Sequence, residues 1–417
     1  MSALETRFIE PLDVLFLRGN KLFGDPGSYG EALIPPWPST AAGALRSRRL
    51  ADAGVDLSAF ARGEIDHPEL GTPERPGPFT LTAFHLARRG ADGAVEPLYA
   101  PPADLVISRD AVGQLQVGAL TPTGFAPLAS HAPGGEGLKP SAHILSSAPL
   151  PWLPVLAESQ RSKPESGYWL TANGWTEYLA GKVPAPEQWV HASKLWAIDP
   201  RVGVGLDTDA RRAADGKLFS VQAVAMHPGL GFLTQVAGAT LPAGGTLRLG
   251  GDGRAAALSS AAVDWPKPDY TAMAAACRCR LVLTTPGLFS TSLPTGEPAP
   301  SRAKGDSRVR DGWLPTGMTG NRPDGYRFDL HGVRGRLVCA AVPRAEVISG
   351  WDQAQWRPKP AQRVAPTGSV YWLDELEATP EALSKLVEHG LWSDPCEDPG
   401  RRAEGFNRLA LAAWGKE

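Results

Sequence analysis

The strongest constraint on the fold is the stretch between residues 8 and 50, where an apolar run, a glycine loop and a proline-rich arm precede a helix. Residues 14–17 are apolar and end at a turn that begins with Arg18, which predicts a buried strand. The glycine loop that follows contains Lys21. The three prolines between residues 34 and 38 lack amide donors and disfavour a helix in the residues before them, so this arm must be extended.

A helix is predicted directly after the proline arm. Ser39 and Thr40 carry hydroxyls that can cap a helix beginning at Ala41, and this helix becomes basic at Arg46. The free amides at a helix start attract anions. Ser39 and Thr40 are therefore candidates for contacting a phosphate.

Length and charge limit the classes of protein that fit this chain. At 417 residues two domains are the natural expectation, and 42% hydrophobic residues suffice for a sizeable core. The formal net charge of -2 argues against a uniformly basic nucleic-acid binder, so any RNA site must be a local patch. No signal peptide and no apolar run of about 18–20 residues is visible, so we expect a cytoplasmic protein without a membrane partner.

A proline-broken linker at residues 264–270 predicts the domain boundary. The first domain would span residues 1–264 with a large insertion at about residues 53–197, and the second would span residues 265–417. Both halves mix strands and helices without regular βαβ alternation, which favours α+β domains with antiparallel sheets, long insertions and hairpins. Inside the insertion, residues 171–179 predict a helix whose neighbouring aromatics pack on a sheet.

Two hairpins are the clearest local predictions. The first pairs residues 201–206 with residues 218–224 and has the turn pair Asp215-Gly216. The basic residues of its tip are Arg211, Arg212 and Lys217. The second hairpin spans residues 246–258 and turns at Asp252-Gly253.

The residues give little support for catalysis or for a metal. Gly250-Gly251-Asp252-Gly253 resembles the GGDD hairpin of polymerase-palm cyclases, but Gly253 stands where the second acidic ligand is needed. Eight histidines and four cysteines show no metal-ligand spacing, so we expect no metal, no cofactor and no enzymatic activity. A Tyr/His pair brought together by the tertiary fold stays open as an alternative.

Five regions of the sequence, the first of them residues 8–50, carry a resemblance to a known family. The strings EPLDVLFLRG and GEALIPPWPSTAAGALRS are similar to the opening of the third subunit of the Cmr complex, the type III-B CRISPR effector, which belongs to the RAMP superfamily. The resemblance returns at residues 201–224, 247–256, 365–376 and 404–414.

The resemblance implies a fold and a role. The fold would be two ferredoxin-like (RRM-like) RAMP domains. The protein would be a non-catalytic, RNA-binding ribonucleoprotein subunit in antiviral defense, holding the 5′ repeat-derived tag of the guide CRISPR RNA. Its protein partners would be the large palm/HD-domain subunit and the helical backbone RAMP subunit. The alternatives are a RAMP endoribonuclease that processes precursor RNA and a purely structural subunit-bridging protein.

The candidate RNA-binding residues combine cations with glycine turns that let an RNA backbone approach. They are Arg18, Lys21, Ser39, Thr40, Arg46, Arg201, Arg211, Arg212, Lys217, Gly250, Gly251, Arg254, Gly368, Ser369, Gly405 and Phe406. The last four resemble the C-terminal glycine loops of RAMP proteins, and a strand-ending turn is the alternative for them. The tip of the first hairpin is predicted to be the main electrostatic contact, and the basic loop with Arg357, Lys359 and Arg363 is the next candidate.

Overall fold

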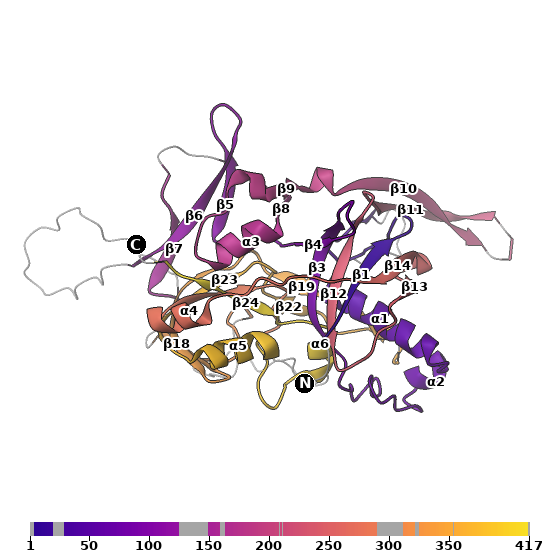
Figure 1. Ribbon diagram of the computed structural model, residues 1–417. Coiled ribbons are helices and arrows are strands. Elements are labelled where there is room, and N and C mark those ends of the chain that lie inside the picture. The colour runs from indigo at the N-terminus through magenta and orange to yellow at the C-terminus, as the bar shows by residue number, and fades with distance from the viewer. Residues whose placement is uncertain are drawn as a thin grey trace, which may run out of the picture.

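The computed structural model describes residues 4–19, 29–124, 149–158, 163–207, 209–210, 212–289, 312–321, 325–352 and 354–415 (Figure 1). Two six-stranded sheets organise these residues. The first sheet has the order β13 (Gly244–Arg248), β14 (Ala255–Ser260), β1 (Glu5–Pro11), β12 (Leu230–Ala237), β3 (Thr80–Arg89), β4 (Val95–Leu98). The second has the order β16 (Met318–Asn321), β17 (Gly325–Leu330), β18 (Val333–Ala341), β23 (Val370–Glu377), β15 (Cys279–Leu283), β24 (Leu409–Ala413).

Every neighbouring pair of strands in both sheets is antiparallel. Four adjacent strands of each sheet share one topology. When they are numbered along the chain, β14-β1-β12-β3 and β24-β15-β23-β18 both have the spatial order 4-1-3-2. The predicted mixture of helices and strands with antiparallel sheets is confirmed.

Helices cover one face of each large sheet. The helices are α1 (Pro38–Asp52), α2 (Leu57–Ala61), α3 (Ala172–Leu179), α4 (Tyr270–Ala276), α5 (Pro380–His389) and α6 (Pro399–Ala403), with short 3-10 turns η1 (Pro186–Gln188), η2 (Ala192–Lys194) and η3 (Gly251–Gly253). Ala41, Ala42 and Leu45 of α1 are buried in the core of the first sheet, because small side chains let the helix approach closely. Leu383 and Leu386 of α5 are buried in the core of the second.

Smaller sheets come from the segments between these elements. The insertion contributes β5 (Leu105–Arg109), β6 (Leu115–Gly124), β7 (Trp152–Leu156), β8 (Tyr168–Leu170) and β9 (Trp189–His191). A long hairpin joins β10 (Trp196–Asp207) to β11 (Arg212–Met226), beside β2 (Tyr29–Gly30). The second half adds β19 (Glu346–Ile348), β20 (Trp351–Asp352), β21 (Arg357–Pro358) and β22 (Gln362–Val364). The hairpin of β10 and β11, here called the arm, extends away from the body at the upper right of Figure 1.

The insertion packs against the second sheet, although it lies in the first half of the chain. Tyr178 and Leu179 of α3 share a buried cluster with Val338 of β18 and Trp372 of β23. The prediction of a helix over residues 171–179 with packed aromatics is therefore confirmed, and Thr171 caps this helix by accepting the amide of Gly174. No helix in the described part of the chain is long and apolar enough to cross a membrane.

Two sequence predictions about the opening stretch are wrong. Leu15, Phe16 and Leu17 are buried and Val14 is partly buried. Residues 14–17 nevertheless form no strand of a sheet, because Leu15 makes only a single bridge to Val224 and the first strand, β1, comes earlier. Ser39 and Thr40 do not cap a helix at Ala41. The helix α1 begins at Pro38, a residue whose ring suits a first helical position, and its N-cap Trp37 makes no side-chain cap bond.

Both predicted hairpins are present, with one correction. The hairpin at residues 246–258 corresponds to β13 and β14, joined through η3. In the arm, however, the last pair is Asp207 with Arg212, so Asp215-Gly216 is not the turn. The register steps from Val204↔Leu218 to Leu206↔Ala213, which places Asp215-Gly216 in a bulge of β11.

Candidate nucleic-acid interface

The structure brings five of the predicted RNA-binding residues to the base of the arm, or next to it. Phe16 is 5% exposed, and two guanidinium groups lie near its ring. The Cζ atom of Arg254 is 5.0 Å from the centre of the Phe16 ring, and the Cζ atom of Arg201 is 5.9 Å from it. Gly250 and Gly251 lie against the backbone and the Cβ of Phe16, and Arg18 follows two residues later in the chain. We call Phe16, Arg201, Gly250, Gly251 and Arg254 the arm-base cluster.

Local backbone geometry explains why glycines occupy this turn. Gly250 has a φ of 75°, and a Cβ added to it would lie 2.7 Å from the carbonyl oxygen of Phe16. The amide of Gly251 donates a 2.8 Å hydrogen bond to that same oxygen. The turn therefore holds Arg254, which follows it directly, against the face of Phe16.

The cluster's arginines have weak carboxylate partners. Nη1 of Arg254 lies 2.7 Å from Asp13, whose side chain is 60% exposed, and Nε of Arg254 is buried without a hydrogen-bond acceptor. Arg201 pairs with Asp199 at 2.8 Å, and both side chains are about 40% exposed. Ion pairs this exposed contribute little, so a phosphate could take either carboxylate's place at low cost.

The arm carries charges of both signs towards its tip. Arg212 and Lys217 are exposed on β11. Asp207 closes β10, and its Oδ1 accepts the amides of Asp209 and Ala210. Arg211 and Lys21 lie outside the described residues.

One face of the arm is apolar and open to solvent, which the sequence reasoning overlooked. Val202, Leu206 and Leu218 are 71%, 66% and 59% exposed, and Ile198 and Val204 are each 41% exposed. Val204 pairs directly with Leu218 across the hairpin. The signal was the alternation of residues 202–206, Val-Gly-Val-Gly-Leu, in which every second side chain lies on the same face.

Arg46 has a packing position. Its Cζ atom lies 5.8 Å from the centre of the Phe79 ring. Burial lowers the pKa of Arg46, and the charge of Glu404 opposes this effect. The side chain of Arg46, on α1, is therefore packed inside the protein near Glu404, the residue that follows α6. Ser39 and Thr40 are partly exposed in the first turn of α1.

The four C-terminal glycine-loop candidates are buried, which favours the alternative of a strand-ending turn over contact with RNA. Ser369 and Phe406 are 0% exposed. A Cβ at Gly368 would lie 2.4 Å from the carbonyl oxygen of Pro101, and one at Gly405 would lie 3.0 Å from Leu81. These glycines let the second half of the chain approach the first half, and their amides donate to Leu283 and Arg402.

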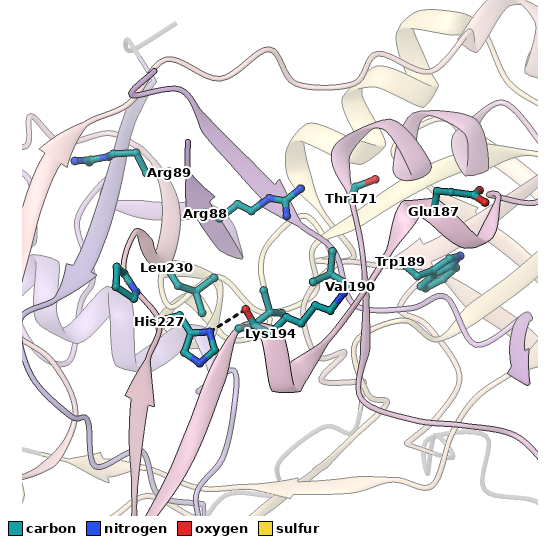
Figure 2. Close-up of a pocket in the computed structure, with 11 residues that line it drawn as sticks. Arg88, Arg89, Thr171, Glu187, Trp189, Val190, Lys194, His227 and Leu230 are labelled. Carbon is teal, nitrogen blue, oxygen red and sulfur yellow. Dashed lines mark hydrogen bonds between the residues drawn. The ribbon is translucent and has the colours of Figure 1, made fainter. Parts of the chain in front are cut away.

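A cavity of about 390 Å³ lies between the first sheet and the insertion (Figure 2). Arg88, Lys194, His227, Glu187 and Trp189 contribute to its lining, and none of them was predicted as a site residue. Arg88 pairs with Glu96 at 2.7 Å, and Nδ1 of His227 lies 3.0 Å from the carbonyl oxygen of Lys194. Within the described residues, no hydrogen bond joins His227 to a carboxylate, and no group of three His, Cys, Asp or Glu could hold a metal ion.

Comparison with known proteins defines the class of the chain. The family model "CRISPR-associated protein (Cas_Cmr3)" matches residues 7–414. The protein therefore belongs to the Cas_Cmr3 family of CRISPR-associated proteins, which confirms the resemblance to the third Cmr subunit.

Solved structures with a similar chain come from type III-B Cmr-beta complexes. One, bound to cognate target RNA and AMPPnP, has 13% identity and a TM-score of 0.40, covering 91% of this chain and 88% of its own. Another, bound to cognate target RNA, has 14% identity and a TM-score of 0.37, covering 88% and 86%. Among curated proteins none matches the sequence significantly.

Proposed function

We propose that the protein is a non-catalytic, RNA-binding subunit of a type III-B Cmr effector that holds the 5′ tag of the guide RNA. Membership of the Cas_Cmr3 family supports a place in such a complex. The observation that carries the RNA assignment is the arm-base cluster, where two guanidinium groups with exposed ion pairs flank Phe16 beside an exposed glycine turn. Guanidinium groups and free backbone recognise phosphate without reading sequence.

We further propose that each large sheet is a variant ferredoxin-like domain, with the boundary between β14 and α4. The 4-1-3-2 order of four antiparallel strands in each sheet supports this assignment. In the first, α1 connects β1 to β3, and in the second, α5 connects β23 to β24. The insertion belongs to the first half in sequence and covers the second sheet in space.

The RNA assignment is tested by replacing Arg201 and Arg254 with alanine and measuring affinity for tag RNA over a range of salt concentrations. Each phosphate neutralised on a single strand contributes about 0.7 to the slope of log affinity against log salt. The double variant should therefore flatten the slope by up to about 1.4 and weaken binding of all tag sequences similarly. Arg334→Ala is the matched control, because Arg334 is an exposed arginine with an exposed carboxylate partner, Asp329, on the second sheet. An unchanged slope in the double variant would remove the arm-base cluster from the RNA site.

A second candidate function, bridging of protein subunits, is favoured by the apolar face of the arm. Exposed apolar patches often mark protein interfaces. Replacing Val202, Leu206 and Leu218 with serine should then reduce incorporation into the assembled complex and leave affinity for free RNA unchanged. Normal incorporation of this triple variant would exclude the arm as the bridge.

A further inference from the structure

A second exposed hairpin, formed by residues 346–364, displays two tryptophans to solvent. Trp356 is 75% exposed and Trp351 is 48% exposed. Their ring centres lie 5.7 Å apart with an interplanar angle of 85°, so each ring supports the other while part of its surface stays open. We call residues 346–364 the tryptophan hairpin. Large apolar rings are usually buried, so a pair this exposed calls for a ligand.

The base of the tryptophan hairpin is anchored firmly in the second half of the protein. Ile348 and Val364 are 0% exposed and share a buried cluster with Leu288, Trp392 and Phe406. Arg401 holds both strands, because its Nη2 donates to the carbonyl oxygen of Ser349 at 3.0 Å and its Nε donates to Gln362 at 3.1 Å. A ligand that binds the two rings would therefore meet a platform whose base is already ordered.

The tip of the hairpin is also held by local hydrogen bonds. Oδ1 of Asp352 accepts the amides of Ala354 and Gln355, both at 3.0 Å. Trp356 follows with a φ of 50°, a left-handed conformation that few non-glycine residues adopt. This turn brings Trp356 back towards Trp351, so the side-chain pair is built by the backbone.

The tryptophan hairpin and the residues just before it carry three exposed arginines. Arg344, Arg357 and Arg363 are exposed, and none of them forms an ion pair within the described residues. Lys359 differs, because its Nζ is paired with Glu404. Arg363 lies opposite Val347, and Arg357 opposite Asp352. Two acids of the hairpin, Glu346 and Asp352, also form no ion pair within the described residues, so the three arginines leave a small positive excess on this surface.

We propose that the tryptophan hairpin is a stacking platform for unpaired bases of single-stranded RNA. Base stacking on aromatic rings tolerates any sequence, and neighbouring arginines neutralise the phosphates between the bases. The charge pattern favours RNA over a protein partner, because burying three unpaired guanidinium groups in a protein interface would require several matching acids. The inference does not depend on the arm-base cluster or on tag recognition, since the platform needs only unpaired bases.

The test uses the full-length protein and a labelled single-stranded RNA of mixed sequence, about 16 nucleotides long, with a duplex of the same length as comparison. Replacing both Trp351 and Trp356 with leucine keeps apolar side chains but removes the aromatic faces. This variant should bind the single strand at least about fivefold more weakly and should bind the duplex as the natural protein does. Replacing both residues with tyrosine should restore most of the single-strand affinity. Because both side chains are exposed, neither variant should lose its thermal unfolding transition.

Two results would overturn the platform. If the leucine variant binds single-stranded RNA with unchanged affinity, the rings contact a protein or nothing. If it binds the single strand and the duplex more weakly by the same factor, the rings do not act by stacking on unpaired bases. The Arg201→Ala/Arg254→Ala variant, measured in parallel, separates this inference from the proposed function. If only the arginine variant loses affinity for single-stranded RNA, the arm-base cluster is supported and the platform is excluded. If only the leucine variant loses this affinity, the platform is supported and the arm-base cluster is excluded.

Discussion

The two large sheets share the order of four adjacent strands but differ in what covers their second face. On the first sheet this face carries a small cluster of Phe8, Ala87, Val95 and Leu233, with Trp265 partly buried beside it. On the second sheet the insertion covers the corresponding face with α3, whose ribbon lies left of the centre of Figure 1. Trp175 and Tyr178 of this helix are buried in the cluster there. The same strand order therefore occurs with a small cluster of side chains on the second face of the first sheet and with a large buried core on the second face of the second sheet.

The charged groups on these two faces differ accordingly. In the second sheet, Arg280 of β15 donates to Asp104 of the insertion at 2.6 Å, and the carboxylate of Asp104 is 1% exposed. The hydroxyl of Tyr178 donates to the same carboxylate at 2.9 Å. In the first sheet, Arg89 lies 4.7 Å from the centre of the Phe8 ring, with one third of its side chain exposed. The difference shows that an added segment, more than topology, sets the dielectric surroundings of a sheet face.

Breaking the buried pair should have the largest effect. Asp104→Ala leaves the guanidinium of Arg280 buried without its counter-charge, so the free energy of unfolding should fall by about 3–5 kcal/mol. Urea denaturation monitored by tryptophan fluorescence measures this change. The double variant Asp104→Ala/Arg280→Met should recover much of the loss, because it also removes the unpaired charge. A loss below about 1 kcal/mol in the single variant would mean that water reaches this site.

A histidine packed beneath the cover of the first sheet should make the stability of the protein depend on pH. His85 of β3 lies between Tyr99 and Trp265, with ring centres at 4.7 Å and 5.8 Å, and burial lowers its pKa to about 4. The folded state thus favours neutral His85. The contribution of His85 to the free energy of unfolding is complete above its unfolded pKa of about 6.5. This contribution is lost as the pH falls towards 4, by up to about 1.4 kcal/mol per pH unit.

The variant His85→Phe tests this dependence, because phenylalanine keeps an aromatic ring and cannot titrate. The drop in unfolding free energy between pH 7 and pH 4.5 should be smaller in the variant by about 2 kcal/mol. Equal drops in both proteins would show that His85 is hydrated in the folded state.

The smallest effect is expected for Arg89→Met, on the outer face of the first sheet. The variant loses a partly exposed cation–π contact with Phe8 and an ion pair with Glu10 at 3.7 Å. Its unfolding free energy should fall by about 0.5–1 kcal/mol in thermal denaturation. Arg88→Met is the neighbouring control with an exposed ion pair, and it should change stability less. If Arg89→Met lowered the free energy of unfolding as much as Asp104→Ala, the two sheet faces would not differ in the way described here.

Local patterns in the sequence sufficed for several elements and for the family. The two hairpins, the helix over residues 171–179 and the antiparallel α+β class follow from alternation, turn residues and caps within short windows. Such signals depend on backbone preferences that act over a few residues. The opening stretch was specific enough to indicate the Cas_Cmr3 family, even though its strand and helix cap were misplaced.

Only the tertiary structure decided which candidate residues share a surface. It brings Phe16, Arg201 and Arg254 together from segments far apart in the chain, and it buries Ser369 and Phe406 where the two halves meet. It also pairs Arg280 with Asp104 across 176 positions. No short window of sequence encodes these outcomes, because burial and long-range pairing depend on how the sheets and the insertion cover one another.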